Sequence, residues 1–532
     1  FGAPSSDLAK TPDPRALDAL ADGLRATQRD QASLLDDFVH LFVPPSGGAA
    51  HPVLHTPHCP ACGGRGDFSA VRFAQPLDLD DPHVGDDQHI LRVRGALISP
   101  LTGPLTTLSR AALDLDRPNV PTPRLWTCHS TDPGWRRLRL PVQGSGGCNV
   151  DDVAAMAAAI GEGLERASLA PPPPTDLLIA SYAELVRDDP QQAIDPRRFD
   201  VFDDAVRAQS GFPYARPSAD ATISWVWGTD LLTRRAVAVP TRRVYVNASP
   251  LHPDEVTDAD WVSGFACRDA LIPALLGGLR EVIERDHFMI AWRNRLPTAG
   301  VDLTDASRLS PATRAVLDAL AARDVAVRCA HLQLDLGCHL AIAQARSDED
   351  GEPATVIAAA AHEDLHAACA RAIDELIANR YVVRETMRAR RQQPLPAPRI
   401  DAVTDMLQHG LLYARADMRP HLDPWWDPPN GQRPLPPPPA APAAPRNALA
   451  TLLARCADAG LTPLAVDLTP PAVRRRGLRV VKVVVAGTYP MLFDERWPHL
   501  GGARMRQMPV DRGLLTAPRR TDERPRVPHP FP

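Results

Sequence analysis

Two segments of the chain carry closely spaced carboxylates followed by an arginine. Residues 162–166 and residues 281–285 both read Glu-x-x-Glu-Arg. Residues three positions apart lie on the same face of a helix, so each pair would present two carboxylates to one point. Such like charges repel unless a cation joins them, and hard divalent cations such as Mg²⁺ prefer oxygen ligands. The expected metal ligands are Glu162, Glu165, Glu281 and Glu284, with Arg166 and Arg285 placed to meet phosphate. For either segment alone, the alternative is a solvated helix face with Glu–Arg pairing.

Helical periodicity places both motifs on helices and predicts further elements around them. The expected helices span residues 15–42, 151–169, 271–292, 364–388 and 447–460. The third long helix, 364–388, carries Glu375 and Arg380. Strand-like runs are residues 90–94, 243–247, 328–346 and 478–486. Because helices and strands alternate, we predict an α/β or α+β fold.

The amino-acid composition argues against several classes of protein. The 532 residues are 44% hydrophobic, enough for a sizeable core, and no apolar run approaches the ~18 residues needed to span a bilayer. A net charge of −5 argues against a nucleic-acid binder driven by phosphate attraction. Nine widely spaced cysteines do not form the pattern of a secreted disulfide scaffold, so we expect a cytoplasmic protein and no membrane partner.

A cluster of histidine and cysteine precedes residue 66. Cys59 and Cys62 form a Cys-x-x-Cys pair, with His51, His55 and His58 close by in sequence. Such a pair is half of a tetrahedral zinc site, and the second half is not obvious from the sequence. We therefore keep two interpretations open, a Zn²⁺ site and a cysteine-containing turn.

Together these segments resemble the YcaO family, specifically the cyclodehydratases that form thiazoline and oxazoline rings in ribosomal peptides. Gly146-Gly147 and the helix that follows are similar to the family's first nucleotide motif. Ser263 and the string Gly-Leu-Arg-Glu-Val-Ile-Glu-Arg-Asp at 278–286 are similar to its second motif, and the helix of Glu375 and Arg380 to its third. The strand after Gly477 and the terminus Pro528-His-Pro-Phe-Pro532 resemble the end of these enzymes.

The resemblance, which covers residues 70–532, implies a mixed α+β fold whose Glu-x-x-Glu helices surround a nucleotide cleft. It implies Mg²⁺ and ATP, used to phosphorylate a backbone amide so that a Cys, Ser or Thr side chain closes a ring. The residues implied to bind the nucleotide are Gly146, Gly147, Arg166, Ser263, Arg285, Glu375 and Arg380. The residues implied to act in catalysis are Pro528, Pro530 and Pro532, whose ordered terminus would supply a carboxylate as a base.

Several positions depart from the family pattern. Cys148 stands in place of a lysine, Ala158 in place of a serine, Pro273 in place of a glutamate and Ala378 in place of a glutamine. Losing one hydrogen-bond partner of a buried ligand costs about 1–3 kcal/mol. Two interpretations therefore compete, an active cyclodehydratase with a divergent pocket and a catalytically degenerate subunit that scaffolds the peptide or a partner.

We divide the chain into four parts. Residues 1–66 are an appended docking segment, 67–422 the YcaO core, 423–445 a proline-rich linker or loop, and 446–532 the C-terminal part of the YcaO domain. The resemblance implies a precursor peptide as substrate and a leader-binding partner related to ubiquitin-activating enzymes. It also implies a dehydrogenase partner in some pathways, and a homodimer or hetero-oligomer.

Overall fold

The computed structural model describes residues 74–531, with gaps at 87, 100–102, 116–121, 131–143, 170, 173, 247, 391–402, 438 and 440–442. It also describes the backbone of β1 (Phe38–Phe42) and β2 (Gly48–Pro52), which form an antiparallel pair. The prediction of a helix through residue 42 is therefore wrong at its end, because 38–42 pair in register with 48–52. The rest of that segment lies outside the described residues.

The first sheet consists of three antiparallel strands and one covering helix. Its order is β3 (Leu105–Ala111), β4 (Arg124–Ser130) and β5 (Gly144–Asn149). Helix α5 (Asp152–Ala167) packs on it, and the side chain of Asp151 caps this helix by accepting from the Val153 amide. The approach is close: a Cβ at Gly147 would lie 2.0 Å from the Ala155 carbonyl oxygen. Gly147 therefore holds α5 against β5.

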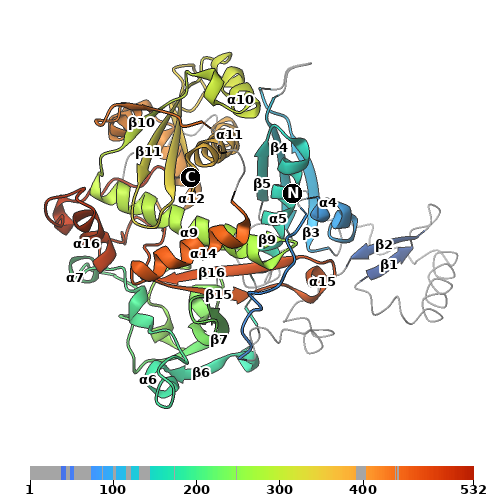
Figure 1. Cartoon of the computed structure of the whole chain (residues 1–532), viewed down its shortest axis with the longest axis vertical. Helices are drawn as coiled ribbons and strands as arrows, with labels where there is room; N and C mark the ends of the chain where they lie inside the picture. The colour runs from blue at the N-terminus through green and yellow to red at the C-terminus, as the bar shows by residue number, and fades with distance from the viewer. Residues whose placement is uncertain are drawn as a thin grey trace, which may run out of the picture.

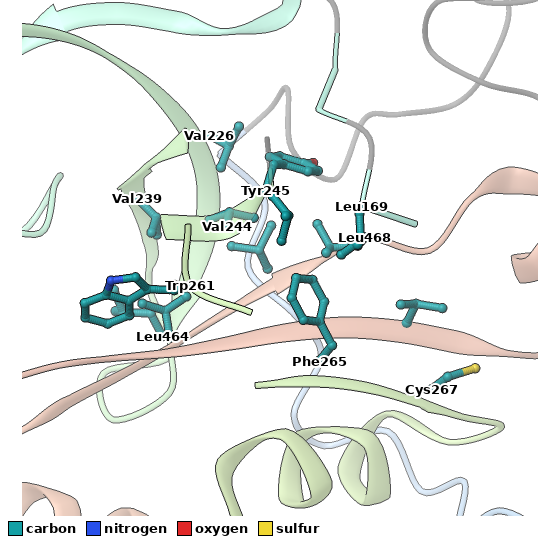
Figure 2. Packing of buried hydrophobic residues seen from close by; sticks show 14 of the residues in the cluster. Leu169, Val226, Val239, Val244, Tyr245, Trp261, Phe265, Cys267, Leu464 and Leu468 are labelled. Atoms are coloured by element: carbon teal, nitrogen blue, oxygen red, sulfur yellow. The ribbon is translucent and has the colours of Figure 1, made fainter. Parts of the chain in front are cut away.

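The second sheet has six strands and contains the apolar cluster drawn in Figure 2. Its path is β6 (Leu178–Ser181), β7 (Thr222–Asp230), β15 (Thr462–Asp467), β16 (Arg479–Ala486) and β9 (Phe265–Arg268), while β8 (Ala236–Pro240) pairs with β7. Trp225, Leu464 and Val480 are fully buried there. Strands from residues 222–268 thus share one core with strands from residues 462–486.

The third sheet has five strands, and long helices flank it. Its order is β13 (Thr355–His362), β12 (His339–Arg346), β11 (Ala326–Gln333), β10 (Ala299–Asp302) and β14 (Gln432–Pro434). Helix α9 (Leu271–Asn294) lies between this sheet and β16, and α11 (Leu365–Ala389) lies between it and the first sheet (Figure 1). Helices α5, α9 and α11 therefore meet where the three sheets converge.

The other helices complete the layers. They are α4 (His89–Val93), α6 (Tyr182–Leu185), α7 (Asp204–Arg207), α8 (Thr241–Val244), α10 (Pro311–Ala321), α12 (Met406–Tyr413), α13 (Asp423–Trp426), α14 (Pro445–Asp458), α15 (Pro471–Arg474) and α16 (Ala503–Asp511). Within the described chain, no helix is both long enough and apolar enough to cross a membrane.

Most predicted elements are confirmed, and the errors are local. The helices at 151–169, 271–292, 364–388 and 447–460 and the strands at 328–346 and 478–486 are present, with small shifts at their ends. Residues 90–94 belong mainly to α4 rather than to a strand, after a turn in which Asp86 accepts from the Gln88 amide. Arg243 lies in α8, buried against Trp261, rather than in a strand. Inside 423–445, α13 and β14 are regular elements, and β14 pairs in parallel with β10.

Candidate functional site

Five glutamates from three helices share one electrostatic neighbourhood. Glu162 and Glu165 come from α5, Glu281 and Glu284 from α9, and Glu375 from α11. The charge of Glu281 acts on Glu165, Glu284 and Glu375, and that of Glu162 acts on Glu165 and Glu375. The structure therefore brings together the two predicted Glu-x-x-Glu pairs and the predicted Glu375.

The chain does not balance the charge of this cluster. Burial and the neighbouring carboxylates raise the pKa of Glu165 to about 8. Burial raises the pKa of Glu284 to about 8 and that of Glu375 to about 7, even though Arg285 opposes both shifts. Carboxyl groups that hold protons near neutral pH are short of positive charge. A divalent cation would supply that charge.

Backbone amides aim three of these carboxylates. The Gly146 amide donates to Glu162 at 2.9 Å, and the Gly264 amide donates to Glu281 at 3.0 Å. The amide of Cys267 on β9 donates to Glu165 at 2.8 Å. Because each helix side chain is tied to a separate strand or loop, the carboxylates are held in place by the fold itself. Gly146 thus contributes to the cluster through its own backbone.

The cluster is wider than a cage for a single bare ion. Among the described residues, no three of these five carboxylates bring their oxygens within 4.8 Å of one another. Mg²⁺ usually keeps several waters and binds one or two protein carboxylates together with substrate phosphates. The spread of the glutamates leaves room for such a mixed set of ligands.

The loop before β9 is fixed by two unusual residues. Gly264 has a φ of +91°, and a Cβ there would lie 2.1 Å from the Val483 carbonyl oxygen, so only glycine fits. The buried Lys482 donates from Nζ to the Trp261 carbonyl at 2.6 Å and to the Ser263 carbonyl at 2.5 Å. Burial lowers the pKa of Lys482 to about 7, while nearby Glu281 opposes the shift. The carbonyl of Ser263 is thus engaged in holding this loop.

Two of the predicted arginines flank the cluster, while the third pairs elsewhere. Arg166 contacts Glu162 at 3.2 Å, and Arg285 Nε contacts Glu284 at 3.2 Å. Arg380 instead forms buried ion pairs with Asp114 at 3.0 Å and with Glu352 at 2.7 Å. Its guanidinium is therefore committed to a structural network away from Glu375, which lies on a different face of α11.

Sequence reasoning missed Arg371, one helical turn before Glu375. Burial and the positive charges of Arg280 and Arg268 lower the pKa of Arg371 to about 10. Its charge also interacts with Glu284, which places it beside the carboxylate cluster. An arginine beside a metal-binding cluster can pair with the phosphate of a bound nucleotide. The spacing Arg371-x-x-x-Glu375 is the signal in the sequence, since these positions share a helix face.

Comparisons with known proteins decide the family. No curated protein sequence matches the chain. A family model described as "YcaO cyclodehydratase, ATP- and Mg²⁺-binding" matches residues 146–489, which include all five glutamates. The chain belongs to the YcaO family.

Solved structures show the same fold. A heterocyclase in complex with substrate and cofactor is similar with a TM-score of 0.73 and 22% identity, over 98% of this chain and 70% of that chain. The heterocyclase TruD is similar with a TM-score of 0.60 and 21% identity, over 93% and 61%. The E. coli microcin synthetase McbBCD complex is similar with a TM-score of 0.52 and 12% identity, over 73% and 90%. The predicted YcaO-type α+β fold is therefore confirmed.

One departure from the YcaO pattern is now visible in space. Cys148 follows Gly147 on β5 and packs beside the third core cluster. Burial and the charge of Asp374 raise the pKa of its thiol well above the ordinary range, so it is neutral. Neighbouring Asn149 donates to Asp374 at 2.9 Å. This edge of the YcaO site therefore lacks the positive charge that a lysine would bring.

The end of the YcaO chain reaches the same site. Pro528, Pro530 and Phe531 are buried, and the guanidinium of Arg285 lies 3.9 Å from the centre of the Phe531 ring. Pro532 lies outside the described residues, so the predicted catalytic role of the proline terminus stays a prediction. Cys59 and Cys62 also lie outside the described residues.

Proposed function

We propose that this YcaO protein is an ATP- and Mg²⁺-dependent cyclodehydratase that converts Cys, Ser or Thr of a ribosomal precursor peptide to thiazoline or oxazoline. The observation that carries the proposal is the five-glutamate cluster, whose pKa values are raised where three helices of the family domain meet. A divalent cation bound among these carboxylates would offset the burial and the mutual repulsion that raise their pKa values.

The residues fit Mg²⁺ and a nucleotide. Glu162, Glu165, Glu281, Glu284 and Glu375 supply oxygen ligands in the number and spread that hydrated Mg²⁺ accepts. Mg²⁺ with ATP, when bound, supplies a transferable phosphoryl group and neutralises its charge.

In this proposal, groups of the chain itself orient the carboxylates and stabilise the charge of the phosphates. Arg285 and Arg371 are placed to pair with phosphate oxygens, and Arg166 steadies Glu162. The amides of Gly146, Gly264 and Cys267 hold the carboxylates in position. In the proposed reaction the substrate thiol or hydroxyl loses its proton and adds to the preceding amide carbon. ATP would transfer its γ-phosphoryl group to the amide oxygen and leave as ADP. That oxygen then leaves as phosphate while the amide nitrogen loses its proton and the C=N bond forms. The protein's share is therefore placement and charge stabilisation.

The partners proposed here are a precursor peptide and a leader-binding protein related to ubiquitin-activating enzymes, in a homodimer or hetero-oligomer; a dehydrogenase would act after ring formation. The McbBCD complex has also been solved with pro-MccB17 bound, and the first heterocyclase with substrate. These structures support a peptide substrate and a multi-protein setting.

The test compares Glu281→Gln with the natural chain in a mixture reconstituted with precursor peptide, partner and Mg-ATP. We expect ring formation, read by mass spectrometry as the loss of one water per ring, to fall by more than about 100-fold. The matched control is Glu385→Gln, a carboxylate on α11 that pairs with Arg388 at the surface. Unchanged ring formation in Glu281→Gln would overturn the proposal.

A second candidate, a catalytically degenerate scaffold subunit, is favoured by one observation. The neutral Cys148 thiol removes a positive charge from the edge of the site. In that case Glu281→Gln would leave product yield unchanged, while surface changes at the partner interface would lower it.

A further inference from the structure

Lys482 carries an ammonium group that is enclosed in the interior of the fold. The residue lies on β16 and is 0% exposed. Its Nζ donates to the Trp261 carbonyl at 2.6 Å and to the Ser263 carbonyl at 2.5 Å, and it lies 3.9 Å from the centre of the Phe265 ring. These three neighbours account for the three hydrogens of an ammonium group. Any effect of Lys482 on a bound ligand is therefore indirect.

A lysine is unusual in this chain. Of its 59 basic residues, two are lysines, Lys10 and Lys482. Lysine carries a compact charge with three rotatable donors, whereas the guanidinium of arginine is a planar fork. Two carbonyls and an aromatic ring surround the single Nζ atom of Lys482. The packing around Nζ thus gives a physical reason for a lysine at this position.

The two carbonyls belong to the short loop that carries the Gly264 amide. Both ends of the loop are anchored in the core, since Trp261 and Phe265 belong to the cluster drawn in Figure 2. The Gly264 carbonyl accepts from the Val483 amide at 2.7 Å, and the Gly264 amide donates to Glu281 at 3.0 Å. Strand β16 thus holds the loop, and the loop holds Glu281.

Glu281 is central to the glutamate cluster, because its charge acts on three of the other four glutamates. A carboxylate that a fixed amide holds in place loses less freedom when it binds a ligand. Without Lys482, the carbonyls of Trp261 and Ser263 would lose a buried donor, and the loop would have to move to find another. The Gly264 amide would move with the loop.

A cavity beside the loop also connects it to Arg285. Ser263 and Lys482 line this cavity together with Arg285, and Val282 of α9 forms part of its apolar wall. Arg285 is the group proposed above to pair with phosphate. Movement of the loop would therefore alter two parts of the site, the carboxylate of Glu281 and the wall next to Arg285.

We propose that Lys482 is a positioning residue of the metal site, which holds loop 261–264 so that the Gly264 amide presents Glu281 to the Mg²⁺ of a bound nucleotide. Lys482 acts through the loop rather than by touching the nucleotide. The inference rests on the proposed function and deepens it, because it extends the site to a buried cation outside the Glu-x-x-Glu motifs.

The first test measures the loop itself in the full chain. Hydrogen exchange of the amides of residues 261–268 is followed by mass spectrometry in the natural chain, Lys482→Met and Thr469→Val. Thr469→Val is the matched control, because it removes a buried hydroxyl that donates to the Val480 carbonyl of the same strand. We expect at least ~10-fold faster exchange in Lys482→Met only. Equal exchange in all three proteins would overturn the role of Lys482 in holding the loop.

The second test links the loop to the ligand. The same three proteins are titrated calorimetrically with a non-hydrolysable ATP analogue and Mg²⁺. We expect Lys482→Met to weaken binding by about 10- to 100-fold and Thr469→Val to change it by less than about 2-fold. Natural affinity in Lys482→Met would overturn the proposal. Weaker affinity with unchanged loop exchange would overturn it too, because Lys482 would then act by its charge alone.

The natural chain provides a further readout if Lys482→Met does not fold. With ¹⁵N-labelled lysine the chain carries label at two side chains, and Lys10→Arg identifies the magnetic resonance signal of Lys482. We expect this signal to move when the Mg-nucleotide binds, because the charge of Glu281 acts on Nζ. A signal that stays fixed at saturating nucleotide would overturn the proposal.

Failure of the proposed function gives a different result. If the natural chain binds no nucleotide, the proposed function fails, and the link between Lys482 and Mg²⁺ fails with it. The exchange comparison needs neither nucleotide nor ring formation, so it still decides whether Lys482 holds the loop.

Discussion

Helix α9 carries two kinds of buried carboxylate only two residues apart. Asp286 is fully buried and bonded to Arg504, which also bonds Asp335, and the Tyr489 amide donates to it as well. Glu284 has one arginine contact, and its pKa is raised to about 8 by burial. We call Asp286 matched, because arginine pairing within the chain balances its charge. We call Glu284 unmatched, because its pKa stays raised despite its arginine contact.

Helix α11 repeats this difference. Arg380 and Arg384 share the carboxylates of Asp114 and Glu352, and the two arginines help to lower the pKa of Asp114 against its burial. On another face of the same helix, the pKa of Glu375 is raised to about 7 by burial and by nearby glutamates. Matched charge thus marks what holds the fold together, and unmatched charge marks where a ligand from outside is expected.

The largest effect should come from the unmatched group. Glu284→Gln keeps the shape of the side chain and removes one negative charge, so we expect binding of Mg-nucleotide to weaken by more than about 100-fold. The melting temperature without nucleotide should not fall, because the change also relieves repulsion from Glu281 and Glu375. Calorimetric titration and thermal unfolding would check both. A fall in stability equal to that of a core mutation would erase the distinction between the two groups.

Changes to the matched pair of Asp286 and Arg504 should instead lower the stability of the fold. Arg504→Met leaves Asp286 and Asp335 buried without their partner, and breaking such a pair typically costs about 3–5 kcal/mol of unfolding free energy. Chemical denaturation would measure this loss. Restored stability in the double variant Arg504→Met, Asp286→Asn would support the pairing, and an unchanged midpoint in the single variant would count against it.

Arg371 and Arg380 of α11 extend the comparison to two arginines, with smaller expected effects. Arg371→Gln should lower nucleotide affinity by about 10-fold, the worth of one charge-assisted phosphate contact, with little change in stability. Arg380→Gln should lower stability and leave nucleotide affinity nearly unchanged, because Asp114 and Glu352 lose their partner. Titration and denaturation of both variants would check this, and a reversed pattern would mean that Arg380 is the nucleotide ligand.

The smallest effect concerns pH. Glu165, Glu284 and Glu375 have folded-state pKa values of about 8, 8 and 7, above the ordinary value near 4.5. At these three positions the folded chain binds more protons than the unfolded chain, so the stability that they contribute should fall as pH rises from about 5 to 8. Glu284→Gln should flatten part of this slope, and Mg-nucleotide should reduce it. Thermal unfolding of the natural chain and of Glu284→Gln across this pH range is the measurement, and equal pH dependence of the two proteins would contradict the shift of Glu284.

Local pattern in the sequence predicts much of the fold and the glutamates that the structure brings together. The helices of Glu162, Glu281 and Glu375 show clear periodicity, and three-residue spacing alone indicates which carboxylates share a face. The strands predicted at residues 90–94 and 243–247 were wrong, because a short apolar run is compatible with either a helix or a strand. Contacts with the rest of the fold decide between the two.

The sequence does not reveal hydrogen-bond and ion-pair partners that lie far apart along the chain. Arg380 looks as well placed for a nucleotide as Arg371, until Asp114, 266 residues away, is brought to it. Tyr413 and Arg293 donate to carbonyls of the C-terminal segment that lie 115 and 232 residues away in the sequence. Neither pairing leaves a periodic or spaced signal, because each depends on how the sheets stack.

The central claim is that unmatched carboxylates at the junction of α5, α9 and α11 await Mg²⁺ with a nucleotide. The most direct test is calorimetric titration of the full chain with a non-hydrolysable ATP analogue and Mg²⁺ at pH 7, in two buffers of different ionisation enthalpy. We predict Mg²⁺-dependent binding whose heat differs between buffers, because protons leave Glu165, Glu284 and Glu375 as the cation binds, and whose affinity collapses in Glu281→Gln. No binding at millimolar nucleotide, or buffer-independent binding that Glu281→Gln retains, would contradict the account.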